Sequence, residues 1–110
     1  MSGKIPSPEE FFGHQMGADR KLVRWDRVVE YFNALGKSPC VKVTELGKST
    51  EGNPFLLAVV TSPENMKRLD KIRAASWRVA HPQGVPVKEI EEIIAEGKAD
   101  IAMTMSIHAT

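Results

Sequence analysis

The feature that most constrains the fold is a pair of apolar segments joined by a run of turn-forming residues. The first segment, CVKVTEL, alternates: Val41 and Val43 point to one side, and Lys42 and Thr44 point to the other, as in a half-buried strand. The second segment, FLLAVVT, is continuously apolar and rich in branched residues, which is typical of a strand buried on both faces. Between them, GKSTEGNP is dense in turn residues. The sequence therefore predicts a hairpin with a long loop.

Two helices are predicted before the hairpin. Ser7, Pro8 and Glu10 have the spacing of a capping box with proline at the first helical position, and Gly13 ends this short helix. A second helix is predicted over residues 24–35, closed by Gly36. Its apolar side chains recur at helical spacing on one face: Trp25, Val28, Val29, Phe32 and Leu35.

Two more helices and a third strand are predicted after the hairpin. Ser62 opens a helix that ends near His81 and Pro82. A shorter helix closed by Gly97 follows, and its apolar stripe consists of Val87, Ile90, Ile93 and Ile94. The segment DIAMTMSIHAT is apolar and predicts a central strand, and the helical crossover before it suits a parallel pair with the second strand. This order of elements indicates the α/β class with a mixed sheet, and residues 1–110 form at most one domain.

Composition argues against several classes of protein. The net charge is +1 and the basic residues are scattered among acidic ones, so we expect no nucleic-acid partner. No apolar run approaches the ~20 residues of a membrane-spanning helix, and no secretory signal is visible at the N-terminus. Cys40 is the single cysteine, and we interpret it as a small residue at the start of a strand, because no acid–base partner lies beside it.

The candidate functional residue is His108, which follows the predicted third strand. Ligand sites in open α/β sheets form outside the carboxyl ends of strands, but position alone leaves His108 open between an incidental and a functional role. A catalytic zinc usually takes three protein ligands. His14 and His81, the other histidines, lack ligand spacing to His108. We expect a loop hydrogen bond for His14 and a favourable interaction with the C-terminus of its helix for His81.

Taken in order, the segments WDRVVEYFNAL, VKVTEL, GKSTEGNP, FLLAVVT and SIHAT resemble the opening third of the zinc carboxypeptidases of the A and B type. In that family an amphipathic helix and a strand precede a turn of the form G-x-[ST]-x-E-G-[RN]-P. An apolar strand and a helical crossover follow, and then a central strand ends in His-x-x-Glu. The resemblance runs from about Phe11 onward, and its most specific element is the turn combined with the spacing to SIHA.

The resemblance implies a truncated three-layer α/β/α fold with a mixed sheet, in which residues 1–110 are the N-terminal portion of a single peptidase domain that is incomplete at its C-terminus. It implies that His108 is the first zinc ligand, that a glutamate three residues later is the second, and that a histidine much further along is the third. The family's catalytic glutamate and its substrate-binding arginine also lie further along.

The implied activity is zinc-dependent hydrolysis of C-terminal peptide bonds in peptide or protein substrates, and the 110-residue chain by itself is expected to be inactive. The resemblance favours a secreted or periplasmic location, and it fixes no oligomeric state. Two residues depart from the common family pattern: Asn53 and Thr110 stand where many members have arginine. Thr110 would alter contacts near the substrate, so a specialised member acting on other peptides or amides stays open.

A second hypothesis is a non-enzymatic binding module, or a degenerate peptidase-like protein, that shares only the fold. Under this hypothesis the turn GKSTEGNP is a recognition loop that exposes Lys48, Ser49 and Glu51.

Overall fold

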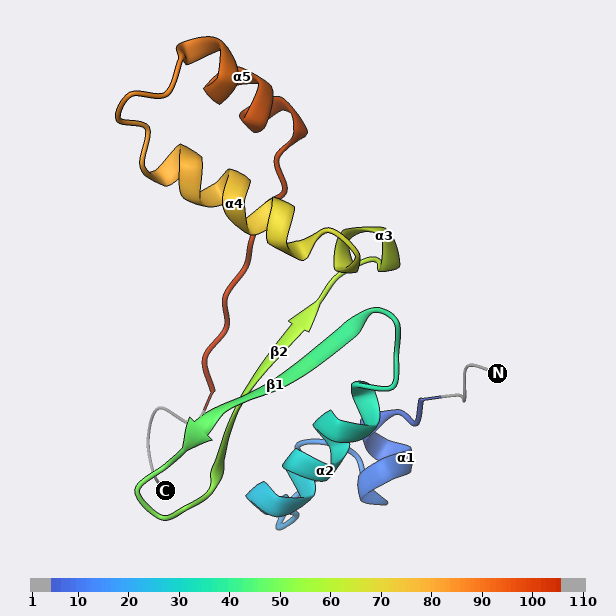
Figure 1. Ribbon diagram of the computed structural model, residues 1–110. Coiled ribbons are helices and arrows are strands. Elements are labelled where there is room, and N and C mark those ends of the chain that lie inside the picture. Colours follow the sequence, from blue (N-terminus) through green and yellow to red (C-terminus); the bar gives the residue numbers. More distant parts are fainter. Residues whose placement is uncertain (1–4, 106–110) are drawn as a thin grey trace. The chain divides into compact units, whose positions relative to one another are not determined.

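A computed structural model describes residues 5–105, which form two compact units that divide between Lys67 and Arg68 (Figure 1). Helices combine with an antiparallel sheet, which confirms the general α/β class. The N-terminal unit (residues 5–67) contains α1 (Pro8–Phe12), α2 (Trp25–Leu35), β1 (Val41–Lys48), β2 (Pro54–Val60) and α3 (Pro63–Met66). The C-terminal unit (residues 68–105) contains α4 (Leu69–Ala80) and α5 (Val87–Glu96).

Helix α1 begins with the predicted capping box. The Ser7 hydroxyl accepts the backbone N–H of Glu10 at 3.2 Å, and the Ser7 N–H donates to the Glu10 carboxylate at 2.7 Å. Gly13 ends the helix with φ +77°, where glycine avoids the strain that a β-carbon would add. Both ends of α1 are therefore specified by neighbouring residues in the sequence.

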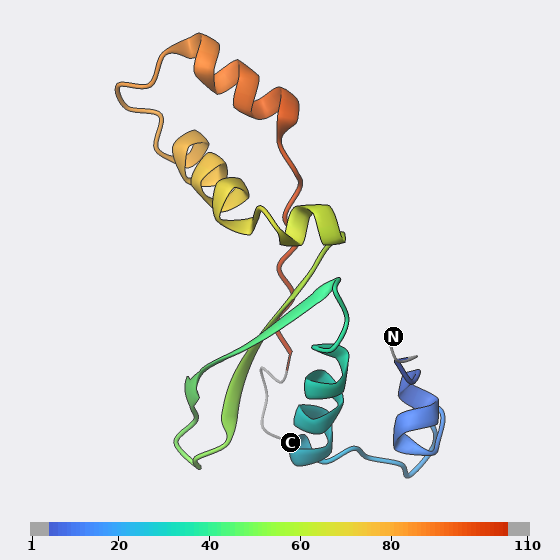
Figure 2. The same cartoon turned by 45° about the vertical axis from the view of Figure 1, so that its right-hand side comes forward.

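An aromatic cluster holds α1 against α2. The ring centroids of Phe11 and Phe12 lie 5.0 and 5.3 Å from that of Tyr31, close enough for favourable tilted contacts. The Tyr31 hydroxyl donates to the carbonyl of Pro6 at 3.1 Å. Both views show α2 lying between α1 and the hairpin (Figure 2).

The hairpin packs one face against α2. Strands β1 and β2 are antiparallel, and Val43 lies opposite Ala58, so both side chains point to the same face. These two residues are half-buried, as are Val41 and Leu56 on that face. A β-carbon added at Gly36, which follows α2, would lie 3.4 Å from the Val43 side chain, so the helix end approaches closely here. The predicted alternation in β1 is confirmed.

Burial of β2 on both faces, which its apolar sequence predicts, is wrong in the described structure. Phe55, Leu57 and Val60 are 62%, 46% and 73% exposed. The sheet of the described residues has only β1 and β2, and α2 packs against one face of it. The apolar pattern of β2 therefore exceeds what the N-terminal unit can cover.

The helices after the hairpin differ from the sequence expectation at one point. The single helix predicted from Ser62 to His81 is two helices, α3 and α4, because the backbone of Arg68 (φ −125°, ψ 24°) leaves the helical region. Ser62 caps α3 as predicted, accepting the N–H of Asn65 at 3.3 Å. The shorter helix that is predicted from the stripe beginning at Val87 and closed by Gly97 is confirmed as α5.

The third strand, predicted over Asp100–Thr110, is wrong for its described part. Residues 97–105 form neither helix nor strand, and residues 106–110 lie outside the described residues. A strand requires a neighbour for its backbone hydrogen bonds, and the described sheet gives this segment no partner. The mixed sheet is likewise not seen among residues 5–105, where the only strand pair is antiparallel.

Within residues 5–105, no side chain is fully buried. Apolar contacts in each unit are made by half-buried residues, such as Phe32 in α2 and Ile93 in α5. No described helix has the length and apolar character needed to cross a bilayer.

Candidate functional site

The predicted zinc ligand His108 lies outside the described residues. Among residues 5–105, no group of three or more His, Cys, Asp or Glu side chains is placed to hold a metal ion. The sequence-predicted metal position therefore stays a prediction.

His81 sits at the C-terminal end of α4, as the sequence indicates. Its backbone N–H donates to the Trp77 carbonyl at 3.0 Å, and its ring Nδ1 also lies 3.0 Å from that oxygen. The imidazole stacks on the Trp77 indole, with a centroid separation of 3.9 Å and an angle of 25° between the planes. These contacts give His81 a structural role at the helix end.

His14 makes the loop contact that the sequence predicts. Its ring Nδ1 lies 3.1 Å from the carbonyl oxygen of the next residue, Gln15. His14 belongs to the N-terminal unit and His81 to the C-terminal unit, and each ring contacts its own local backbone.

Cys40 directly precedes β1 and is half-buried. Its backbone N–H donates to the Ser38 hydroxyl at 3.2 Å, and its carbonyl accepts the N–H of Thr61 at 3.0 Å. The backbone of Cys40 thus extends the hairpin by one further hydrogen bond, which confirms its place at the start of a strand.

The turn between β1 and β2 is closed by hydrogen bonds from a single residue. Ser49 donates its N–H to the Asn53 carbonyl at 2.8 Å, accepts the Gly52 N–H at its own carbonyl at 2.9 Å, and accepts the Asn53 N–H at its hydroxyl at 3.2 Å. Gly52 has φ +77°, a conformation that favours glycine. The strands extend to Lys48 and from Pro54, so the loop is shorter than predicted.

Helix α2 fixes the position of this turn. The Trp25 indole N–H donates to the carbonyl of Pro54 at 3.2 Å, joining the start of the helix to the start of β2. Lys48, Ser49 and Glu51 are all exposed, as the recognition-loop hypothesis requires. The Ser49 hydroxyl accepts a hydrogen bond within the turn, from the Asn53 N–H. Lys48 and Glu51 are the exposed charged side chains of the turn.

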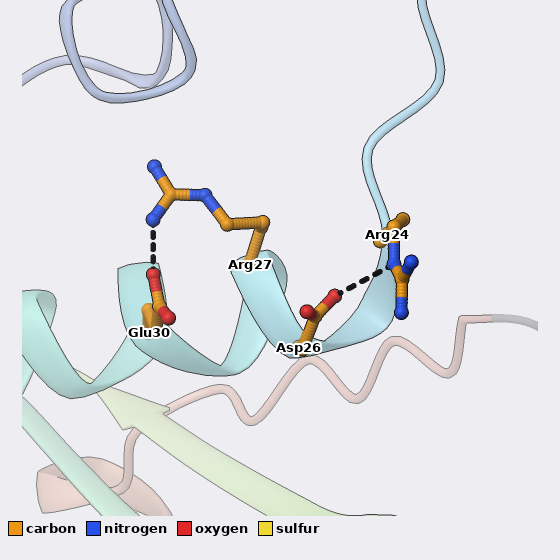
Figure 3. Close-up of polar contacts among 4 residues, drawn as sticks. All are labelled: Arg24, Asp26, Arg27 and Glu30. Carbon is orange, nitrogen blue, oxygen red and sulfur yellow. Dashed lines mark hydrogen bonds and ion pairs between the residues drawn. The ribbon is translucent and has the colours of Figure 1, made fainter.

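Charged side chains on α2 are paired with one another on the surface (Figure 3). Arg24 contacts Asp26 at 3.3 Å, and Arg27 forms an ion pair with Glu30 one helical turn later. The Arg27 guanidinium also lies 5.0 Å from the centre of the Phe11 ring. These side chains are largely exposed, so we expect the two ion pairs to contribute little to stability.

The C-terminal unit holds two open concavities. One, of about 750 Å³, surrounds the Trp77–His81 stack and includes Asp70, Arg73 and Gln83. The other, of about 600 Å³, lies between α4 and α5 and is lined by Ile72, Val79, Ile93 and Ile94, with basic residues at its margin.

An ion pair joins the two helices of the C-terminal unit. Arg78 Nε and Nη2 lie 2.5 and 3.2 Å from the two oxygens of Glu89. The hydrogen bond from Arg78 lowers the pKa of Glu89 below its ordinary value of 4.5, and the same bond raises the pKa of Arg78.

Of the contacts in the C-terminal unit, the Trp77–His81 stack could be predicted from the sequence and the Arg78–Glu89 ion pair could not. Trp77 and His81 are four residues apart, the spacing that brings helical side chains together, so the pair could have been found. The partners Arg78 and Glu89 lie on different helices, and no periodicity relates them.

Comparison of the chain with protein-family models, with curated proteins and with solved structures finds no match.

Proposed function

We propose that the chain forms the N-terminal part of a zinc-dependent carboxypeptidase domain with a three-layer α/β/α fold, and that His108 is one of its zinc ligands. The observation that carries the proposal is the turn GKSTEGNP, which joins β1 to β2. The hairpin that contains this turn follows the amphipathic helix α2. Helix, strand, turn and strand thus occur in the order that the family resemblance implies.

The proposed reaction is hydrolysis of the C-terminal peptide bond of a peptide or protein. A zinc ion in such an enzyme activates water and polarises the scissile carbonyl. Residues 5–105 supply no metal-binding group, so none of them is given a step in the reaction. The remaining ligands are proposed to be the glutamate three residues after His108 and a distant histidine. A secreted or periplasmic location is part of the same proposal.

The proposal is tested first by zinc binding to the 110-residue chain. We expect weak binding, far below that of a three-ligand site, because His108 contributes one ligand. His108→Gln should abolish this binding, as followed by titration calorimetry, while His14→Gln and His81→Gln should leave it unchanged. Equal zinc binding by the wild-type chain and His108→Gln would contradict the assignment.

Activity provides a separate measurement. The 110-residue chain should release no C-terminal amino acid from peptide substrates, with or without added zinc. Chelator-sensitive hydrolysis by this chain would show that a complete site exists within it, and would overturn the proposed division of the ligands.

A non-enzymatic binding module is the alternative, and the turn is the observation that favours it. Its backbone is held by the hydrogen bonds of Ser49, while Lys48 and Glu51 face outward with no ion pair among the described residues. An ordered loop with exposed charges suits recognition of a partner. The residues encoded after Thr110 discriminate the two hypotheses: a glutamate at the next position favours the enzyme, and a stop codon favours the binding module.

A further inference from the structure

Residues 98–105 carry large apolar side chains that the structure leaves open to solvent. They follow α5 and adopt neither helix nor strand. Ile101, Met103 and Met105 are 86%, 78% and 74% exposed. The start of the segment is fixed at one point, because the Ser76 hydroxyl on α4 donates to the Asp100 carboxylate at 3.4 Å. The two methionine thioethers beyond that point are accessible to small molecules in solution.

The other described methionines are more protected. Met66 in α3 is half-buried, and Met16 in the loop after α1 is 42% exposed. The four described methionines therefore differ in solvent exposure, and Met103 and Met105 are the most exposed of them.

We propose that Met103 and Met105 are a paired modification site, at which a peroxide oxidant converts both thioethers to sulfoxides. In each reaction an oxygen atom passes from the peroxide to sulfur: the O–O bond breaks, an S–O bond forms, sulfur loses two electrons and the peroxide is reduced, to water in the case of hydrogen peroxide. Access of the oxidant to sulfur determines which methionines react.

The placement of the two methionines gives this modification a consequence. In a β-strand alternate residues point to the same side, so Ile101, Met103 and Met105 would share one face if this segment packed as a strand. Two sulfoxides change that face from apolar to polar. Burying it in a protein core then costs free energy, because the S–O groups lose their hydrogen bonds to water. Oxidation therefore opposes any packing of this segment as a buried strand. The inference does not depend on the proposed zinc chemistry.

The test is the rate of sulfoxide formation at each methionine of the 110-residue chain in dilute hydrogen peroxide, followed by proteolysis and mass spectrometry. We expect Met103 and Met105 to react roughly threefold or more faster than Met66, with Met16 between them. The same reaction in concentrated urea should bring the rates together, because unfolding removes the difference in access.

Two variants separate this site from general oxidation. The mass of the intact chain rises as each methionine gains an oxygen atom. The double variant Met103→Leu/Met105→Leu should lose the fast phase of this mass increase, whereas Met66→Leu should retain it. Leucine matches methionine in size and apolar character and carries no sulfur. The proposal is overturned if Met103 and Met105 react no faster than Met66 in the folded chain, or if the fast phase persists in the double variant.

Discussion

At the scale of single residues, three serine hydroxyls determine where helices and turns begin. Ser7 and Ser62 accept backbone N–H groups at the starts of α1 and α3, and Ser49 does the same within the hairpin turn. Each serine bonds a residue three or four positions away. Short range is the reason that the sequence predicts the two helix caps from their spacing alone.

The pair Arg78–Glu89 gives a prediction about pH. The pKa of Glu89 is lowered in the folded chain, so the stabilisation from its charged form is complete above the unfolded pKa and is lost as the pH falls through the folded pKa. Glu89→Gln should therefore lower the melting temperature of the helical circular dichroism signal at neutral pH. The difference from wild type should shrink below about pH 4.5, the ordinary value.

Glu91→Gln is the matched control for this measurement. It removes a carboxylate from the same helix, at a position with no ion pair among the described residues. Equal effects of Glu89→Gln and Glu91→Gln across the pH range would show that the contact with Arg78 does not stabilise the unit.

At the scale of elements, the periodicity of apolar residues predicts where helices and strands form, but it does not predict how they pack against one another. The helical spacing in α2 and the alternation in β1 identify both elements, because each pattern reflects the one face that becomes half-buried. The continuous apolar run of β2 identifies a strand but overestimates its burial. Burial depends on what covers the second face, and the sequence of the strand itself does not contain that information.

The hydrogen bond between Trp25 and Pro54 gives a prediction at this scale. Trp25→Phe keeps the aromatic ring but removes the N–H that holds the start of β2. Loss of this bond should reduce the stability of the hairpin by about 1 kcal/mol. Amide hydrogen exchange in β1 and β2 should then be about fivefold faster, the factor that corresponds to that free energy.

Trp77→Phe provides the comparison. Trp77 lies in the C-terminal unit and is 67% exposed. Its replacement should leave exchange in the hairpin unchanged. If Trp25→Phe fails to accelerate exchange there, the indole does not hold the turn against α2.

At the scale of the whole molecule, the described residues do not form a buried hydrophobic core. No side chain of residues 5–105 is fully buried, and large apolar side chains such as Phe55, Val60 and Ile101 remain exposed. Apolar burial is the main favourable contribution to folding. We expect the 110-residue chain to melt over a broad temperature range and to self-associate as its concentration rises, because both edges of the two-stranded sheet lack a partner strand among the described residues. A sharp, reversible melt of a monomer in sedimentation experiments would contradict this expectation.

The candidate site belongs to this largest scale and was the least predictable from the residues alone. The sequence points to His108 through its place after the predicted third strand and through the family resemblance, and His108 lies outside the described residues. The proposed second ligand lies three residues after His108 and the proposed third much further along, so neither can be identified from the residues of this chain.

The most direct test of the central claim is the sequence encoded after Thr110 in the parent gene. The proposed carboxypeptidase requires a glutamate immediately after Thr110, which completes His-x-x-Glu, and a further histidine well downstream. Any other residue at that position, or a stop codon, would contradict the assignment of His108 to a carboxypeptidase zinc site.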